Sequence, residues 1–286
     1  MPLSPRRVPV QPLDAHRFFL GECARWDGHR LSVVDILAGD LWTGVGTSPL
    51  ERRLHLDLPL GAAVPARHGG TILAAGDGIA LLDRDGALDW WTRPIAGLEP
   101  VRRFNDAAVD PSGRLWFGSM DHDGTPGNGA LHRLTPDRAA VTMIDGLGCP
   151  NGPAFSLDGS SMYLSDSTRR VVSRYPVREG GGLEEPSIFI EVGNLGVPDG
   201  LTVDAEDHLW VAFWGGSAIG RFSPAGVLVD LLGVPARQPT SVCVADDLLI
   251  VTSARGGLAD PNPLDGAVLI VDFPVSGPAP TLFDPL

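Results

Sequence analysis

The sequence of 286 residues contains no lysine, because all 22 of its basic residues are arginine. This absence excludes a Schiff-base lysine, a lysine general base and a P-loop nucleotide site. Acidic residues number 35, which gives a formal net charge of −13 at pH 7. The basic residues form no cluster larger than adjacent arginine pairs. We therefore expect nucleic acid and anionic membrane surfaces to be poor partners.

Cysteine is also scarce. The chain has Cys23, Cys149 and Cys243, which cannot all pair with one another and show no CxxC spacing. We interpret them as small packing residues, with thiol ligation of a metal as the alternative. No segment approaches the roughly 18 apolar residues of a transmembrane helix, and residues 1–7 lack the apolar run of a secretory signal. These features predict a soluble cytoplasmic protein.

Long stretches with the 3.6-residue period of a helix are missing, whereas glycine and proline are abundant, at 36 and 26 residues. Short apolar runs bounded by Gly, Pro and Asp are typical of strands separated by tight turns. Successive runs lie roughly 40 to 47 residues apart, which is the period of a four-stranded propeller blade. The runs are residues 31–34, 71–73, 115–117, 162–164, 209–211 and 249–251.

The repeat predicts an all-β fold, a six-bladed β-propeller in which residues 1–286 form a single domain. We expect the ring to close by pairing a strand from residues 9–20 with the last blade, around residues 267–273. Ring closure leaves only short strand edges exposed. Two segments depart from the repeat. Residues 121–129 form either a lid beside the axis or a solvated connection, and residues 178–182 are expected to be a hairpin tip.

Four of the units begin with an oxygen-bearing side chain and reach Asp or Ser five residues later. The openers are Glu22, Asn105, Asn151 and Asp199. If the repeats superpose, these residues occupy one equivalent position, and a closed ring directs all of them towards its axis. Asn-Gly and Asp-Gly are also ordinary turn dipeptides. The interpretation as axial residues therefore depends on their shared position in the repeat.

The carboxylates of Glu22 and Asp199 and the amide oxygen of Asn151 make an oxygen-only ligand set. Such a set suits one divalent ion, Ca²⁺, Mg²⁺, Mn²⁺ or the borderline Zn²⁺ and Fe²⁺. Three protein ligands leave positions for water and substrate, as in catalytic metal sites. A serine nucleophile is disfavoured because the sequence has no GxSxG motif. Trp116 and Trp210, at equivalent strand positions, are interpreted as packing residues.

The chain resembles the SMP-30/gluconolactonase/regucalcin family of six-bladed, metal-dependent lactonases. The resemblance rests on ordered stretches that span nearly the whole chain: LGECARWD (20–27), RFNDAAVDPSGRLWFGSM (103–120), GALHRL (129–134), PNG (150–152), PDGL (198–201) and VTSAR (251–255). Cys23 stands where many members of the family have glycine, a change expected to affect packing rather than ligation.

The resemblance implies that Glu22, Asn151 and Asp199 bind the metal and that Asp199 is also the general acid/base. It further implies that Arg103 and Asn105 hold the substrate, with Asn105 able to reach the metal through water.

A further acidic substrate contact is expected shortly after Met120. Counting places it at Asp123, and Asp121 is an equally plausible candidate because this loop varies.

The implied reaction is hydrolysis of a sugar-acid lactone, such as glucono-, xylono- or arabinono-lactone, to the open aldonate. Alternatives are a promiscuous esterase or phosphotriesterase, which the same kind of metal site would serve, and a non-enzymatic calcium-binding or interaction propeller. The expected partner is therefore a small sugar lactone. The sequence leaves the oligomeric state, the metal and the sugar open.

Overall fold

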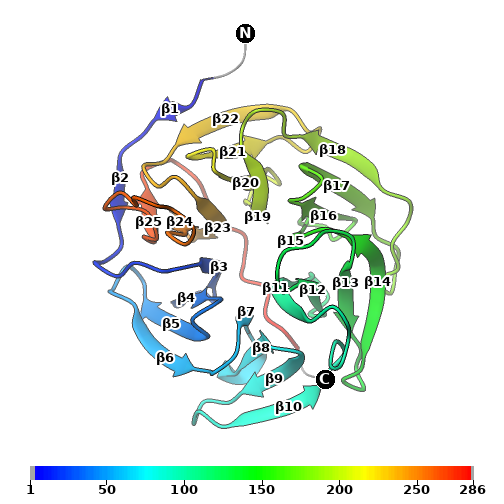
Figure 1. The fold of residues 1–286 in the computed structure, drawn as a ribbon. Coiled ribbons are helices and arrows are strands. Elements are labelled where there is room, and N and C mark those ends of the chain that lie inside the picture. Colours follow the sequence, from blue (N-terminus) through cyan, green and yellow to red (C-terminus); the bar gives the residue numbers. More distant parts are fainter. Residues whose placement is uncertain (1–3, 285–286) are drawn as a thin grey trace.

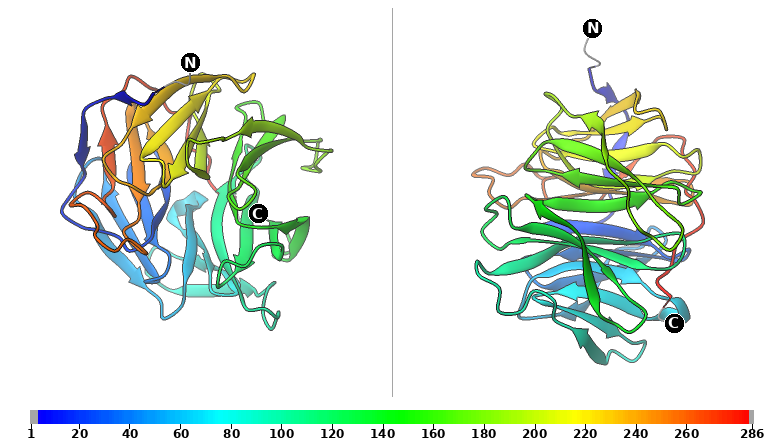
Figure 2. Two further views of the ribbon diagram at one scale, coloured as in Figure 1. Left: turned by 45° about the horizontal axis from the view of Figure 1, so that its top comes forward. Right: turned by 90° about the vertical axis from the view of Figure 1, so that its right-hand side faces the viewer.

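The computed structural model describes residues 4–284, and in them the chain forms six sheets arranged around one axis (Figure 1). Residues 1–3, part of the N-terminal segment considered above, and residues 285–286 lie outside the described part of the chain. Figure 2 shows the same ring from two further directions, with the red C-terminal segment running along one face. The predicted six-bladed β-propeller is confirmed.

The first three blades follow one another along the chain, each with its first strand innermost. Blade 1 consists of β3 (Gly21–Trp26), β4 (Arg30–Asp35), β5 (Asp40–Val45) and β6 (Glu51–His55). Blade 2 consists of β7 (Leu60–Pro65), β8 (Thr71–Ala75), β9 (Gly78–Leu82) and β10 (Leu88–Thr92), with a short 3₁₀ helix at Arg67–Gly69. Blade 3 consists of β11 (Arg102–Val109), β12 (Leu115–Asp121), β13 (Gly129–Leu134) and β14 (Ala140–Leu147).

The other blades repeat this order, and the last two also take up strands from the N-terminal segment. Blade 4 consists of β15 (Pro150–Phe155), β16 (Ser161–Asp166), β17 (Val171–Pro176) and β18 (Ser187–Glu191). Blade 5 consists of β19 (Val197–Val203), β20 (Leu209–Trp214), β21 (Ala218–Phe222), β22 (Leu228–Gly233) and the added β1 (Arg6–Arg7). Blade 6 consists of β23 (Pro239–Ala245), β24 (Leu248–Ser253), β25 (Leu269–Val271) and β2 (Val10–Pro12).

The ring closes as the sequence predicts. β2 pairs antiparallel with β25, so the N-terminal segment completes the last blade. In addition, β1 pairs parallel with β22, a contact that the sequence pattern did not indicate. The hairpin tip at residues 178–182 is also confirmed, since the Arg178 amide donates to the Gly182 carbonyl.

The turn after the innermost strand is built around a buried Asp in blades 3 and 5. Asp110 accepts hydrogen bonds from two turn amides, from Arg114 Nε and from Trp116 Nε1, which lies 2.9 Å away. Asp204 makes the equivalent contact with Trp210 Nε1, also at 2.9 Å. Both tryptophans are fully buried, which confirms them as packing residues. The recurrent Asp therefore fixes the turn and orients the indole at the same time.

The innermost strands contact one another around the ring and enclose the central channel. In each of them the pairing register with the second strand is interrupted, at Glu22/Arg25, Leu60/Ala62, Phe104/Ala107, Asn151/Ala154, Pro198/Leu201 and Pro239/Val242. Such irregularities re-aim side chains locally. Every opener predicted from the sequence lies at or directly beside one of them, which places those residues at one end of the channel.

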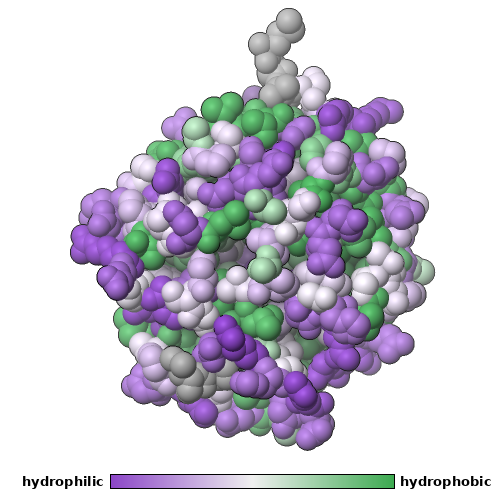
Figure 3. Space-filling model, turned by 180° about the vertical axis from the view of Figure 1, so that it is seen from behind, coloured by the Kyte–Doolittle hydropathy of each residue, from purple (hydrophilic) through white to green (hydrophobic). Residues whose placement is uncertain are grey.

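A C-terminal strap, residues 274–284, crosses the opposite end of the channel from blade 6 to blades 2 and 3 (Figure 1). The Gly277 amide donates to the Asp246 carbonyl at one end, and the Phe283 carbonyl accepts from Arg67 N at the other. Phe283 is buried in the apolar core of blades 1 to 3. Figure 3 looks onto this face, where hydrophilic residues are spread around the rim. Within residues 4–284, no helix is long and apolar enough to span a bilayer.

Candidate metal and substrate site

A cavity of about 380 Å³ lies at the end of the channel away from the strap. The residues that line it are Leu20, Glu22, Ile36, Arg103, Asn105, Cys149, Asn151, Ser167, Thr168, Val197, Asp199 and Trp214. The structure therefore brings together all the predicted site residues except the acidic residue of the loop after β12. They come from β3, β11, β15 and β19, which are far apart in the sequence.

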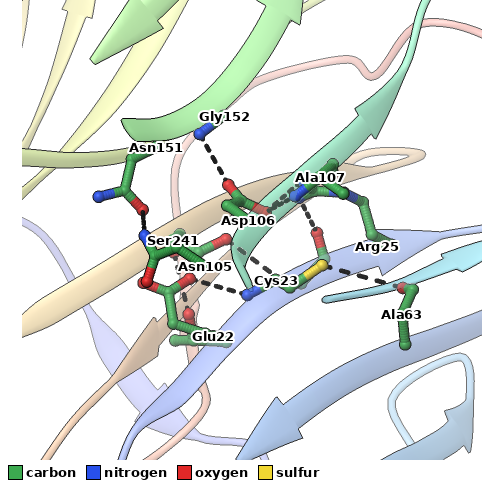
Figure 4. Close-up of polar contacts among 12 residues, drawn as sticks. Glu22, Cys23, Arg25, Ala63, Asn105, Asp106, Ala107, Asn151, Gly152 and Ser241 are labelled. Carbon is green, nitrogen blue, oxygen red and sulfur yellow. Dashed lines mark hydrogen bonds and ion pairs between the residues drawn. The ribbon is translucent and has the colours of Figure 1, made fainter. Parts of the chain in front are cut away.

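A chain of hydrogen bonds connects the neutral and basic members of the site. Arg103 Nη1 donates to Asn105 Oδ1 at 2.9 Å, and Asn105 Nδ2 donates to Asn151 Oδ1 at 2.9 Å. Asn151 Nδ2 in turn donates to Ser167 Oγ at 2.8 Å. Figure 4 shows the two asparagine side chains meeting beside Glu22. This chain orients the amide oxygen of Asn151 and holds Arg103 against the wall of the cavity.

Glu22 and Asp199 are buried carboxylates that, within the part of the chain that the structure describes, have no basic side chain at ion-pair distance. Burial, together with the neighbouring Asp106, raises the pKa of Glu22 to about 8. The pKa of Asp199 is raised well above its ordinary value by burial first and by the charge of Glu22 second. Two buried acidic side chains that repel each other and have no ion-pair partner among the described residues favour a bound cation, because the cation stabilises their charged forms.

The donor set fits a divalent metal ion. Glu22 and Asp199 supply carboxylate oxygens and Asn151 an amide oxygen, which are ligands of hard cations. Among residues 4–284, no cluster of three or more His, Cys, Asp or Glu is arranged to hold a metal, so the amide is needed to complete the set. Three ligands on one side of an open cavity leave coordination positions for water and substrate.

Arg103 is the basic residue of the cavity. The residue is 8% exposed, and its Nη1 donates to the Phe104 carbonyl as well as to Asn105. Nε is buried and has no hydrogen-bond partner among the described residues. A buried donor without a partner is costly, and an oxygen of a bound ligand would satisfy it. Burial lowers the pKa of this guanidinium.

Neither candidate for the additional acidic contact lines the cavity. Asp121 is the last residue of β12 and is fully buried, with Oδ2 accepting from Asn128 Nδ2. Asp123 lies in the exposed loop, where its side chain accepts from the Thr125 amide. Their roles in substrate binding stay predictions.

Asp106 is a buried acidic residue that the sequence interpretation missed. Its Oδ1 accepts from Arg25 Nη2 at 2.8 Å and from the Ala107 amide, and its Oδ2 accepts from the Gly152 amide at 2.9 Å (Figure 4). A signal for it is present in the sequence. Asp106 follows the opener of its repeat directly, where the other repeats with polar openers have cysteine or glycine.

Thr240 is a second buried polar residue that the sequence interpretation missed. It occupies the opener position of blade 6, the unit for which no polar opener was recognised, and its hydroxyl donates to the Gly21 carbonyl. Thr240 does not line the cavity; instead it ties blade 6 to blade 1.

Two cysteines, Cys23 and Cys149, lie near the site. Cys23 is fully buried, and Cys149 is partly exposed at the wall of the cavity. Burial raises the pKa of each thiol to about 12. Cys23 belongs to the apolar core, and its Sγ lies 3.9 Å from the Ala63 carbonyl oxygen, which supports the packing interpretation for this residue.

Comparison with known proteins agrees with this geometry. The protein-family model described as the SMP-30/Gluconolactonase/LRE-like region matches residues 20–255. The chain belongs to this family. The match begins two residues before Glu22 and includes every residue that lines the cavity.

Three relatives illustrate the range of the family. The chain is 35% identical to 6-deoxy-6-sulfogluconolactonase of Pseudomonas putida, over 92% of this chain and 94% of that protein. It is 36% identical to pentonolactonase XacC of Haloferax volcanii, over 83% and 82%. The crystal structure of a calcium-binding protein, regucalcin from Agrobacterium tumefaciens, superposes with a TM-score of 0.91 at 27% identity and covers 98% of this chain and 99% of that one.

Proposed function

We propose that this protein is a metal-dependent lactonase that hydrolyses a sugar-acid lactone to the open aldonic acid. One observation carries the proposal. Glu22 and Asp199, two buried acidic residues without an ion-pair partner among residues 4–284, share a cavity with an oriented amide and a buried arginine. Relatives of similar length are named as lactonases of sugar acids, which supports aldonolactones such as glucono-, xylono- and arabinono-lactone as substrates.

Glu22, Asn151 and Asp199 would hold the divalent ion. When bound, the ion supplies an electrophile for the lactone carbonyl or for the attacking water. Asp199 takes the proton of the water as the new carbon–oxygen bond forms. It returns this proton to the ring oxygen as the ester bond breaks, which leaves a carboxylic acid and an alcohol. Its burial in the cavity favours this role, because burial makes a carboxylate more basic.

Arg103 and Asn105 would position the lactone. The free Nε of Arg103 offers a fixed donor to a carbonyl or ring oxygen, and its guanidinium is held in place by the Phe104 carbonyl and by Asn105. Asn105 contributes indirectly as well, because its amide orients Asn151. A donor that is already fixed before the substrate binds costs little reorganisation during the reaction.

The test is a proton-release assay on metal-stripped protein reloaded with Ca²⁺, Mg²⁺, Mn²⁺, Zn²⁺ or Fe²⁺ and supplied with a panel of aldonolactones. Asp199→Asn keeps an oxygen ligand but removes the proton acceptor. We expect this variant to retain metal while kcat falls on the order of 10² to 10⁴. Wild-type activity in metal-loaded Asp199→Asn would assign the proton transfer to another group.

A calcium-binding propeller without enzymatic activity is the second candidate. The observation in its favour is the structural relative described as a calcium-binding protein. Calcium binding, together with no proton release from any lactone of the panel, would favour this function over the lactonase.

A further inference from the structure

A buried ion pair lies directly beside the proposed metal ligands and takes no part in the hydrolysis described above. Arg25 Nη2 contacts Asp106 Oδ1 at 2.8 Å, and the two side chains are 16% and 1% exposed. The same nitrogen donates to the Ala107 carbonyl at 2.6 Å. The pair bridges β3 and β11, the strands that carry Glu22 and Asn105.

The pair forms a layer of charge between two hollow regions of the channel. Asn105, on one side, lines the site cavity, whereas Arg25 lines a chamber of about 470 Å³ towards the C-terminal strap. Asp106 does not line the site cavity, and both of its oxygens accept hydrogen bonds from Arg25, the Ala107 amide and the Gly152 amide. Asp106 therefore touches the site from two directions. It follows Asn105 in the sequence, and it binds the amide of Gly152, which follows the proposed ligand Asn151.

The charge balance of this region depends on Arg25. Glu22, Asp199 and Asp106 are three buried acidic side chains around one end of the channel. Of these, only Asp106 has an ion-pair partner among the described residues. We propose that Arg25 sets the metal affinity of the site by cancelling the charge of Asp106, so that a divalent cation meets the charges of Glu22 and Asp199 without that of Asp106.

This proposal rests on the metal site of the proposed function. It predicts that loss of the ion pair increases the metal affinity instead of decreasing it. Removal of one partner of a buried ion pair ordinarily destabilises the fold, because it leaves an uncompensated buried charge. Removal of Arg25 alone should instead tighten metal binding, because the uncompensated Asp106 attracts the cation. A unit charge about 10 Å from a divalent cation, at an effective dielectric constant of about 20 and with the screening of about 0.1 M salt, changes a binding constant roughly tenfold.

The experiment measures the Kd of Ca²⁺ and of Mn²⁺ for metal-stripped protein by calorimetry, with a chelator as competitor. Arg25→Met keeps the buried aliphatic stem and removes the guanidinium. The matched control is Arg221→Met, which breaks the pair with Asp204 in the turn of blade 5, where the side chains are 13% and 1% exposed. We expect about tenfold tighter binding in Arg25→Met and less than a twofold change in Arg221→Met, although both variants lose thermal stability.

Two further variants test the proposal if Arg25→Met does not fold, and their metal affinities are measured in the same way. Asp106→Asn leaves Arg25 unpaired and should weaken metal binding about tenfold. The double variant Arg25→Met/Asp106→Asn is neutral at this point, like the wild type, and should bind metal within about threefold of it. The double variant separates charge from packing, because it lacks the ion pair but keeps the charge balance.

Unchanged or weaker binding by folded Arg25→Met overturns the inference. If that variant does not fold, a double variant that binds as weakly as Asp106→Asn overturns it. A wild-type protein that binds neither cation overturns it too. Failure of the lactonase proposal gives a different result, since a protein without lactone hydrolysis can still show the predicted series of Kd values.

Discussion

His132 should make the fold sensitive to mild acid. This residue lies on β13 and is 5% exposed. Its Nε2 is 2.9 Å from Ser119 Oγ and its Nδ1 is 3.2 Å from Thr142 Oγ1, while the ring stacks on Phe117. Burial, assisted by the charge of Arg102, lowers the pKa of His132 from 6.5 to about 4. The folded protein therefore holds the imidazole neutral at a pH where the unfolded chain protonates it.

The size of the effect follows from proton linkage. Between pH 6.5 and 4 the unfolded chain binds more protons at this residue than the folded protein does, so the free energy of unfolding falls as the pH is lowered. The difference between a pKa of 6.5 in the unfolded chain and about 4 in the folded protein corresponds to about 3 kcal/mol below pH 4, and to about 2 kcal/mol at pH 5. Domains typically have only 5 to 15 kcal/mol in total, so the loss is measurable.

The assay compares urea unfolding of the wild type and of His132→Gln at pH 7, 5.5 and 4.5. The variant keeps a polar partner for Ser119 but cannot gain a charge. We expect it to be less stable than the wild type at pH 7 and to lose less stability on acidification. Other titrating groups are common to the two proteins, so their contribution cancels in the difference. A stability difference that stays constant over this pH range would refute the reasoning.

Four further outcomes are expected. Glu22→Ala should weaken metal binding, with activity partly restored by excess metal in the proton-release assay. Arg103→Ala should chiefly raise KM if the guanidinium binds substrate and transition state alike, and should lower kcat if it serves the developing oxyanion, which steady-state kinetics separates. Asp204→Ala leaves Trp210 Nε1 buried without its acceptor and should cost about 3 to 5 kcal/mol in denaturant unfolding. Phe283→Ala should cost about 3 to 5 kcal/mol and raise proteolysis of the strap, because the ring is buried against blades 1 to 3.

Local chemistry was sufficient to predict the propeller. Every blade except blade 2 repeats the same succession of apolar strand, Asp-containing turn and apolar strand, and these signals act over a few residues. The buried Asp110 and Asp204 beneath their tryptophans show why the pattern recurs: a turn built this way needs the carboxylate wherever it is used. Closure between β2 and β25 could also be predicted, since a ring must satisfy its last edge.

The candidate metal ligands could be predicted from the sequence for a related reason. Glu22, Asn105, Asn151 and Asp199 stand at one position of the repeat, so ring symmetry converts a sequence register into a place near the axis. Neighbours that break the repeat could not be placed in this way. Asp123 was favoured by counting along a loop, and the folded chain leaves it exposed while the adjacent β12 buries Asp121.

Folding alone decided the electrostatic surroundings of the site. Arg25 and Asp106 are 81 residues apart and meet only because β3 and β11 converge on the channel. The crossing of the C-terminal strap likewise joins residues from opposite ends of the chain. A repeat specifies what each unit has in common, because the same local interactions form in every copy. Contacts between unlike residues of different units depend on the distances that the closed ring imposes, and these set the charge around the candidate metal.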